Sequence, residues 1–277
     1  MTPPATGTGS VRAFRGEFVD FLDDPRQAAG AVRHIADGYL IVREGRVEAL
    51  MQATAGPPTG VPVTDLRGAL VLPGFIDAHI HYVQTDVIAS PGRQLLDWLN
   101  DYTFPAEAAF ADRDHAAQVA SFFLDELLRN GTTTAAVYPS VHATSVDAFF
   151  AAAQARRLRM IAGKVMMDRH CPENLRDTAK SAYEDSSALI ERWHGQGRLA
   201  YAVTPRFAAT STERQLELAG RLHGLPWPLR NRHPVVTLLE VADGGDASGF
   251  SGIDDLDVVV GLDASEQARL WLYREAQ

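Results

Sequence analysis

The stretch that decides the fold of this chain is Pro73-Gly74-Phe75-Ile76-Asp77-Ala78-His79-Ile80-His81. Side chains alternate between the two faces of a β-strand, so His79 and His81 project from the same face and Ile80 from the opposite one. Two imidazoles on one face, at the C-terminal end of a buried strand, are placed to bind one metal ion. The alternative is an ordinary pair of polar residues at a strand end. The apolar run Ala69-Leu70-Val71-Leu72 is predicted to begin the same strand.

Composition restricts the classes of protein and of partner. The 277 residues suffice for one large domain, or for one large and one small domain. A net charge of -9 makes nucleic acid an unfavourable partner. Cys171 is the one cysteine, so the chain cannot form an internal disulfide. No apolar run approaches the ~20 residues that span a bilayer. We therefore predict a cytoplasmic protein without membrane contact.

Residues 1–10 are rich in Pro, Thr and Gly and contain no apolar segment of a secretory signal, which predicts a disordered lead-in. Residues 11–68 are typical of short strands and turns. The clearest signal is a hairpin in which Glu44-Gly45 joins strands over 38–43 and 46–50. Phe14, Phe18 and Phe21 are expected to pack against this sheet. So few strands alone bury too little surface to be stable.

Strands and helices alternate from residue 69 onward, which predicts parallel βαβ units. The first strand ends at His81. Later strands are predicted over 133–138, 158–166 and 199–204, and helices over 112–130, 145–157, 177–194 and 211–223. Asp112 or Asp114 is expected to cap the first of these helices, and Gly131 to end it. The predicted fold class is α/β, with four strand–helix units between residues 69 and 223.

The sequence resembles the guanine deaminases of the amidohydrolase superfamily over roughly residues 10–223. The resemblance is carried by the stretch Pro73–His81, by Tyr82-Val83-Gln84 and by the run from Leu95 to Glu107. Asn130-Gly131-Thr132-Thr133-Thr134 and Val203-Thr204-Pro205-Arg206-Phe207 are similar as well. The similarity stops near His223, and our hypothesis is a truncation or a shifted reading frame at that point. The resemblance implies an incomplete (β/α)8 TIM-type barrel over 69–223, a partial β-sandwich segment over 11–68 and a divergent tail over 224–277. It also implies zinc-dependent hydrolysis of guanine to xanthine and ammonia by a homodimer.

The resemblance also implies roles for individual residues. His79 and His81 would bind Zn2+, which lowers the pKa of a bound water. Gln84 would pair with a purine edge, Arg206 would donate to the purine carbonyl, and Phe207 would cover the ring. For Arg206 the alternative is a loop-closing guanidinium, and for Phe207 a core position.

Motifs that the family places on later strands do not occur in this sequence. They comprise a His followed by Ser-Glu, a further His, and an Asp near the last strand. No general acid or base is therefore assigned, and His79 and His81 alone make an incomplete site. Two alternatives stay open: another hydrolase or deaminase of cyclic amidines from the same superfamily, and a non-catalytic fragment that exposes strand edges.

Overall fold

The computed structural model describes residues 11–92, 94–223 and 236–237, and the chain divides into two compact units, Met1–Gly74 and Phe75–Gln277. The predicted lead-in over 1–10 lies outside the described residues, as does the tail over 224–277 apart from two of its residues. Within the described part of the chain, no helix combines the length and the apolar character needed to cross a bilayer.

The first unit contains one four-stranded sheet, in the order β3-β2-β1-β4. Its strands are β1 (Val11–Phe21), β2 (Val32–Arg43), β3 (Arg46–Gln52) and β4 (Val63–Val71). The antiparallel pair β2–β3 turns through Glu44 and Gly45, whose φ angles are 51° and 77°. Two successive positive φ angles fit a type I′ turn, so the predicted hairpin is confirmed. Phe18 is buried as expected, whereas Phe21 is 56% exposed and the expectation for it was wrong.

The strand that carries the histidines begins later than the sequence suggested. Leu70 and Val71 belong to β4, which runs parallel to β1 and places them opposite Glu17 and Phe18. The barrel strand β5 begins at Phe75. Pro73 has no backbone N–H to donate to a sheet, which explains why one apolar run is divided between two strands.

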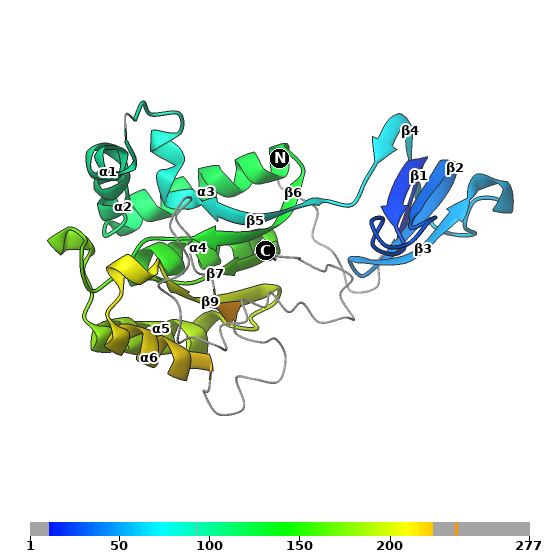
Figure 1. The fold of residues 1–277 in the computed structure, drawn as a ribbon. Helices are drawn as coiled ribbons and strands as arrows, with labels where there is room; N and C mark the ends of the chain where they lie inside the picture. Colours follow the sequence, from blue (N-terminus) through cyan, green and yellow to red (C-terminus); the bar gives the residue numbers. More distant parts are fainter. Residues whose placement is uncertain (1–10, 93, 224–235, 238–277) are drawn as a thin grey trace. The chain divides into compact units, whose positions relative to one another are not determined.

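The second unit is built on a parallel sheet in the order β10-β9-β7-β6-β5, with β8 paired to β9. The strands are β5 (Phe75–His81), β6 (Thr132–Tyr138), β7 (Arg159–Ala162), β8 (Val165–Met166), β9 (Leu199–Pro205) and β10 (Val236–Thr237). The helices are α1 (Leu95–Trp98), α2 (Phe104–Ala109), α3 (Arg113–Arg129), α4 (Ala143–Arg156), α5 (Ala179–Trp193) and α6 (Glu213–His223). Strands and α-helices alternate from β6 to α6, except that β8 follows β7 directly (Figure 1). The predicted α/β class and parallel units are confirmed.

Both faces of this sheet are buried, because successive strand residues enter two different apolar clusters. Ala135, Val137, Met160, Tyr201 and Val203 pack with apolar residues of α3, α4, α5 and α6. Ala136, Tyr138, Ile161, Ala200 and Ala202 form a second cluster with Leu99 and Phe104. Apolar residues therefore fill both faces of the sheet. The polar residues His81 and Arg206 lie at the C-terminal end of β5 and directly after β9, respectively.

Local signals set the ends of the elements. Asp112 caps α3 as predicted, because its Oδ1 accepts a hydrogen bond of 2.8 Å from the backbone N–H of His115. Gly131 follows the helix with a φ of 83°. The predicted third strand is interrupted at Gly163, between β7 and β8. A Cβ on Gly163 would lie 1.6 Å from the backbone oxygen of Ala202, so only glycine allows this close approach to β9.

Candidate metal and substrate site

The imidazoles of His79 and His81 converge at the end of β5. Their Nε2 atoms lie 3.2 Å apart. Two nitrogens that bind one zinc ion at about 2.0–2.1 Å in tetrahedral geometry lie about 3.3 Å apart. The pair therefore fits two positions of one metal site. Oδ1 of Asp77 accepts a 3.0 Å hydrogen bond from the backbone N–H of His79, which supports the backbone between these two residues.

Tyr138 supports both rings from the neighbouring strand. It is opposite His81 in the β5–β6 register, and its ring stacks on that of His81 with centroids 4.6 Å apart and an interplanar angle of 15°. Its centroid lies 4.7 Å from that of His79. Sequence reasoning did not identify this residue. The available signal was its place as the last residue of the predicted second strand.

Gln84 follows β5 on a short 3-10 helix, Tyr82–Val87, that keeps it beside the histidines. Tyr82 is fully buried and anchors this helix, because its hydroxyl donates to the backbone oxygen of Ser145 over 2.6 Å. The Nε2 atom of Gln84 lies 3.2 Å from Nδ1 of His81. The predicted substrate residue is therefore adjacent to the predicted metal ligand.

Arg206 lies directly after β9, and its side chain is 2% exposed. Its backbone N–H donates to the oxygen of Met166 over 3.2 Å, and its guanidinium lies 5.7 Å from the ring centroid of Phe104. Phe207 is half-buried, and its backbone oxygen accepts from the N–H of Thr210. Among the described residues, the Phe207 ring has no aromatic or cation–π contact with the histidines, Gln84 or Arg206.

Glu107 of α2 connects the two predicted substrate residues. Its Oε1 accepts from Nε2 of Gln84 over 3.1 Å, and its Oε2 accepts from Nη1 of Arg206 over 2.5 Å. An unbroken contact series therefore runs from His79 through His81, Gln84 and Glu107 to Arg206. Sequence reasoning included Glu107 in the similar stretch but gave it no role, because nothing local indicates that a helical Glu faces an Arg on a distant strand.

The charge state of His81 suits metal binding. Burial, together with the positive charge of Arg206 and the neighbouring His79, lowers the pKa of its imidazole to about 3. The neutral imidazole is the form that binds metals. Within the described ranges no third His, Cys, Asp or Glu joins this pair in a possible metal cluster. The described residues thus provide two candidate ligands, whereas a catalytic zinc site usually has three protein ligands.

Comparison with known proteins agrees with this geometry. The model of the amidohydrolase family matches residues 70–222. The chain belongs to the amidohydrolase family. It is 49% identical to the guanine deaminase of Escherichia coli strain K12 over 223 residues, which cover 78% of this chain and 51% of that protein. This amidohydrolase therefore spans about half the length of that curated relative.

Solved structures share the fold of this amidohydrolase. The E. coli guanine deaminase structure is 44% identical with a TM-score of 0.76, over 84% of this chain and 53% of that one. The guanine deaminase from C. acetobutylicum, solved with guanine bound in its active site, is 25% identical with a TM-score of 0.71. That match covers 78% of this chain and 51% of the other. The matched structures support the assignment of a partial barrel of the amidohydrolase type.

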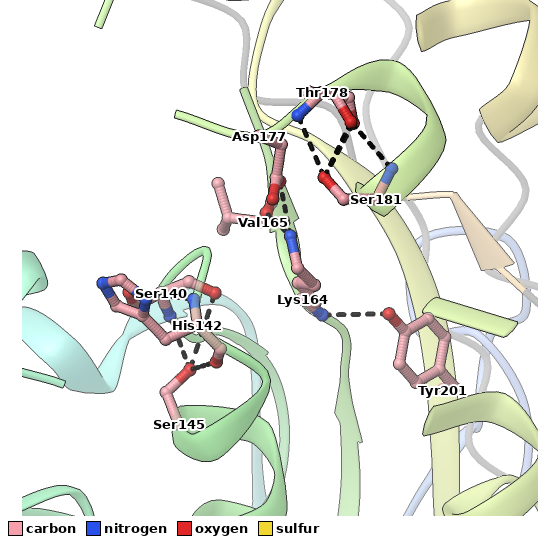
Figure 2. A network of polar contacts seen from close by, with 9 residues as sticks. All are labelled: Ser140, His142, Ser145, Lys164, Val165, Asp177, Thr178, Ser181 and Tyr201. Carbon is pink, nitrogen blue, oxygen red and sulfur yellow. Dashed lines mark hydrogen bonds and ion pairs between the residues drawn. The ribbon is translucent and has the colours of Figure 1, made fainter. Parts of the chain in front are cut away.

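A second polar network of the amidohydrolase lies around Lys164, between β7 and β8 (Figure 2). Lys164 is buried and forms an ion pair with Asp177, while its backbone N–H donates to the hydroxyl of Tyr201 over 3.1 Å. Burial lowers the pKa of Lys164 and raises that of Asp177, and their pairing opposes both shifts. His142 and Asp177 line a pocket of about 290 Å³. The residues that line this pocket include none of His79, His81, Gln84 and Arg206.

Proposed function

We propose that this amidohydrolase deaminates guanine to xanthine and ammonia in guanine catabolism, with Zn2+ as cofactor. The observation that carries the proposal is the contact series from His81 through Gln84 and Glu107 to Arg206. It sets an amide and a guanidinium beside two converged imidazoles. Guanine has a ring amide that the Gln84 carboxamide and the Arg206 guanidinium can bind. It also carries the exocyclic amine that hydrolysis removes.

The substrate is bound by side chains at the C-terminal ends of the strands, where barrels of this type carry their chemistry. Arg206 offers several N–H donors, and we assign it to the purine carbonyl. Gln84 pairs with an N–H of the purine edge. Phe207 covers the ring face, which requires its ring to approach the bound purine. Together these contacts orient the carbon that bears the amine toward the histidines.

His79 and His81 would hold the metal through their Nε2 atoms. When bound, zinc supplies an acidified water for hydrolysis of the C–N bond. One water and one guanine then give one xanthine and one ammonia. The proposal requires at least one further ligand, because no group of three or more His, Cys, Asp or Glu residues in the described ranges could hold a metal ion. It also requires a proton-transfer group.

The decisive experiment uses the purified full chain. Zinc content and ammonia release from guanine are measured together, with cytosine and adenine as competing substrates and His34→Ala as an exposed-histidine control. We expect bound zinc and guanine-dependent ammonia. Turnover of cytosine or adenine, with no turnover of guanine, would instead support another cyclic-amidine hydrolase. Purine binding without ammonia release would support a non-catalytic fragment.

The remaining assignments are also proposals. We propose a β-sandwich segment that ends at Gly74, half a barrel that runs from Phe75 to residue 223, and a divergent tail over 224–277. We further propose a cytoplasmic homodimer that binds a small purine and neither nucleic acid nor membranes. The similarity to guanine deaminases supports the homodimer, and the single half-buried Cys171 suits a reducing compartment. Size-exclusion chromatography with light scattering measures the molecular mass of the protein and so tests the proposed dimer.

A further inference from the structure

Glu107 is placed to control the orientation of another side chain. Its side chain is 2% exposed and accepts two hydrogen bonds, one from Nε2 of Gln84 and one from Nη1 of Arg206. We infer that Glu107 is a positioning residue that fixes which way the Gln84 carboxamide faces, and so selects ligands that present a ring N–H to it. This inference rests on the proposed purine-binding function.

The polarity follows from the chemistry of the two groups. An ionised carboxylate only accepts hydrogen bonds, whereas a carboxamide has one donating and one accepting end. Turning the Gln84 oxygen toward Glu107 would place two acceptors together, so the NH2 group must face the carboxylate. The same nitrogen lies 3.2 Å from Nδ1 of His81, so the amide oxygen is the end turned away from both side chains.

The oxygen of Gln84 is consequently the end that remains for a ligand. Across the described part of the chain, Oε1 of Gln84 accepts no hydrogen bond. A ligand at this position must then donate. The N1–H of a purine with a carbonyl at C6 meets that requirement, and a purine whose N1 is unprotonated does not. Glu107 would therefore contribute to specificity without touching the ligand.

Replacing Glu107 by glutamine reverses this polarity. The new side chain has one acceptor, and Arg206 has only donors, so the oxygen of the new amide must face Arg206. Its NH2 group then faces Gln84, which turns its own oxygen inward and its NH2 group toward the ligand. Glu107→Gln should thus convert an acceptor for the ligand into a donor at nearly constant volume.

The test measures binding of two probes to the full, zinc-supplemented chain: hypoxanthine, which has N1–H, and unsubstituted purine, whose N1 accepts. Neither carries an amine, so binding is read without turnover. The ratio of their affinities should fall at least about tenfold in Glu107→Gln and in Gln84→Ala. Glu107→Asp, which keeps a pure acceptor, should retain the wild-type preference. Asp177→Asn, which neutralises another buried carboxylate, is the matched control for nonspecific destabilisation and should leave the ratio unchanged.

Each outcome decides a different point. A wild-type chain without preference for hypoxanthine overturns both this inference and the proposed function. A wild-type preference that persists in Glu107→Gln or in Gln84→Ala overturns the inference alone. An equal loss of affinity for both probes in Glu107→Gln would show that Glu107 has only a structural role. Should Glu107→Gln fail to melt cooperatively, Gln84→Ala decides, because it leaves the pair between Glu107 and Arg206 intact.

Discussion

Glu107 and Arg206 form a buried ion pair of 2.5 Å, although 99 positions separate them along the chain. Each side chain is 2% exposed. The pair fixes α2 against the end of β9 and connects the two halves of the candidate substrate site. Most of the testable consequences concern such contacts between distant segments.

Removing one member of this pair should destabilise the second unit strongly. Glu107→Ala leaves the Arg206 charge buried without its partner, and we expect a loss of about 3–5 kcal/mol in the free energy of unfolding. Urea denaturation measures it. Arg214→Ala removes the exposed pair with Glu217 and should change the unfolding free energy by no more than about 0.5 kcal/mol. Equal effects of the two variants would contradict the assigned burial.

Two glycines should respond to alanine with opposite signs. Gly163→Ala forces a Cβ against the oxygen of Ala202, where the distance would be 1.6 Å, so β7 and β9 must separate and the melting temperature must fall. Gly220 lies in α6 with open space around its position, and alanine there should add about 0.5–1 kcal/mol through helix propensity. Thermal melts of both variants measure the effects, and a stabilised Gly163→Ala would refute the close approach.

Metal content should depend on both imidazoles at the end of β5. His79→Ala and His81→Ala each remove one of the two converging nitrogens, and zinc affinity should fall by at least about tenfold in each. Equilibrium dialysis with metal analysis measures this loss. His34→Ala serves as control because that ring lies in the first unit, where it contacts Glu17. Wild-type zinc affinity in either site variant would exclude the pair as ligands.

Alkaline pH should reveal the burial of Tyr201. Burial raises the pKa of its hydroxyl far above the usual value of 10. The folded protein therefore keeps a proton that the unfolded chain releases, so the stabilisation is complete below pH 10 and declines as the pH rises beyond it. Tyr201→Phe should lower stability at neutral pH, through loss of the bond to the Lys164 N–H, yet flatten the decline above pH 10. Urea titrations from pH 8 to 11 test this, and an unchanged slope would contradict it.

Sequence reasoning succeeded where the signal is local. Asp112 caps α3 and Glu44-Gly45 turns the hairpin because capping and turn formation depend on a few neighbouring residues. It failed where one apolar run serves two strands. Leu70 pairs with Glu17 of β1, and no pattern in the residues around Leu70 indicates that it pairs with this strand.

The candidate site shows the same division. Family resemblance named His79, His81, Gln84 and Arg206, and the structure brings these four side chains into one contact series. Glu107, which completes the series, received no role from the sequence. Tyr138 was missed as well, because its importance comes from lying beside His81 across two strands.

The sequence by itself determined the class of the fold and the shared direction of His79 and His81. Hydrophobic period, caps and turns act over a few residues, and strand alternation places i and i+2 on one face. Only the tertiary structure decided that Glu107 lies between Gln84 and Arg206, and that Tyr138 supports both imidazoles. Those contacts join segments distant in the chain, and their partners are set by how helices and strands pack, which no local pattern encodes.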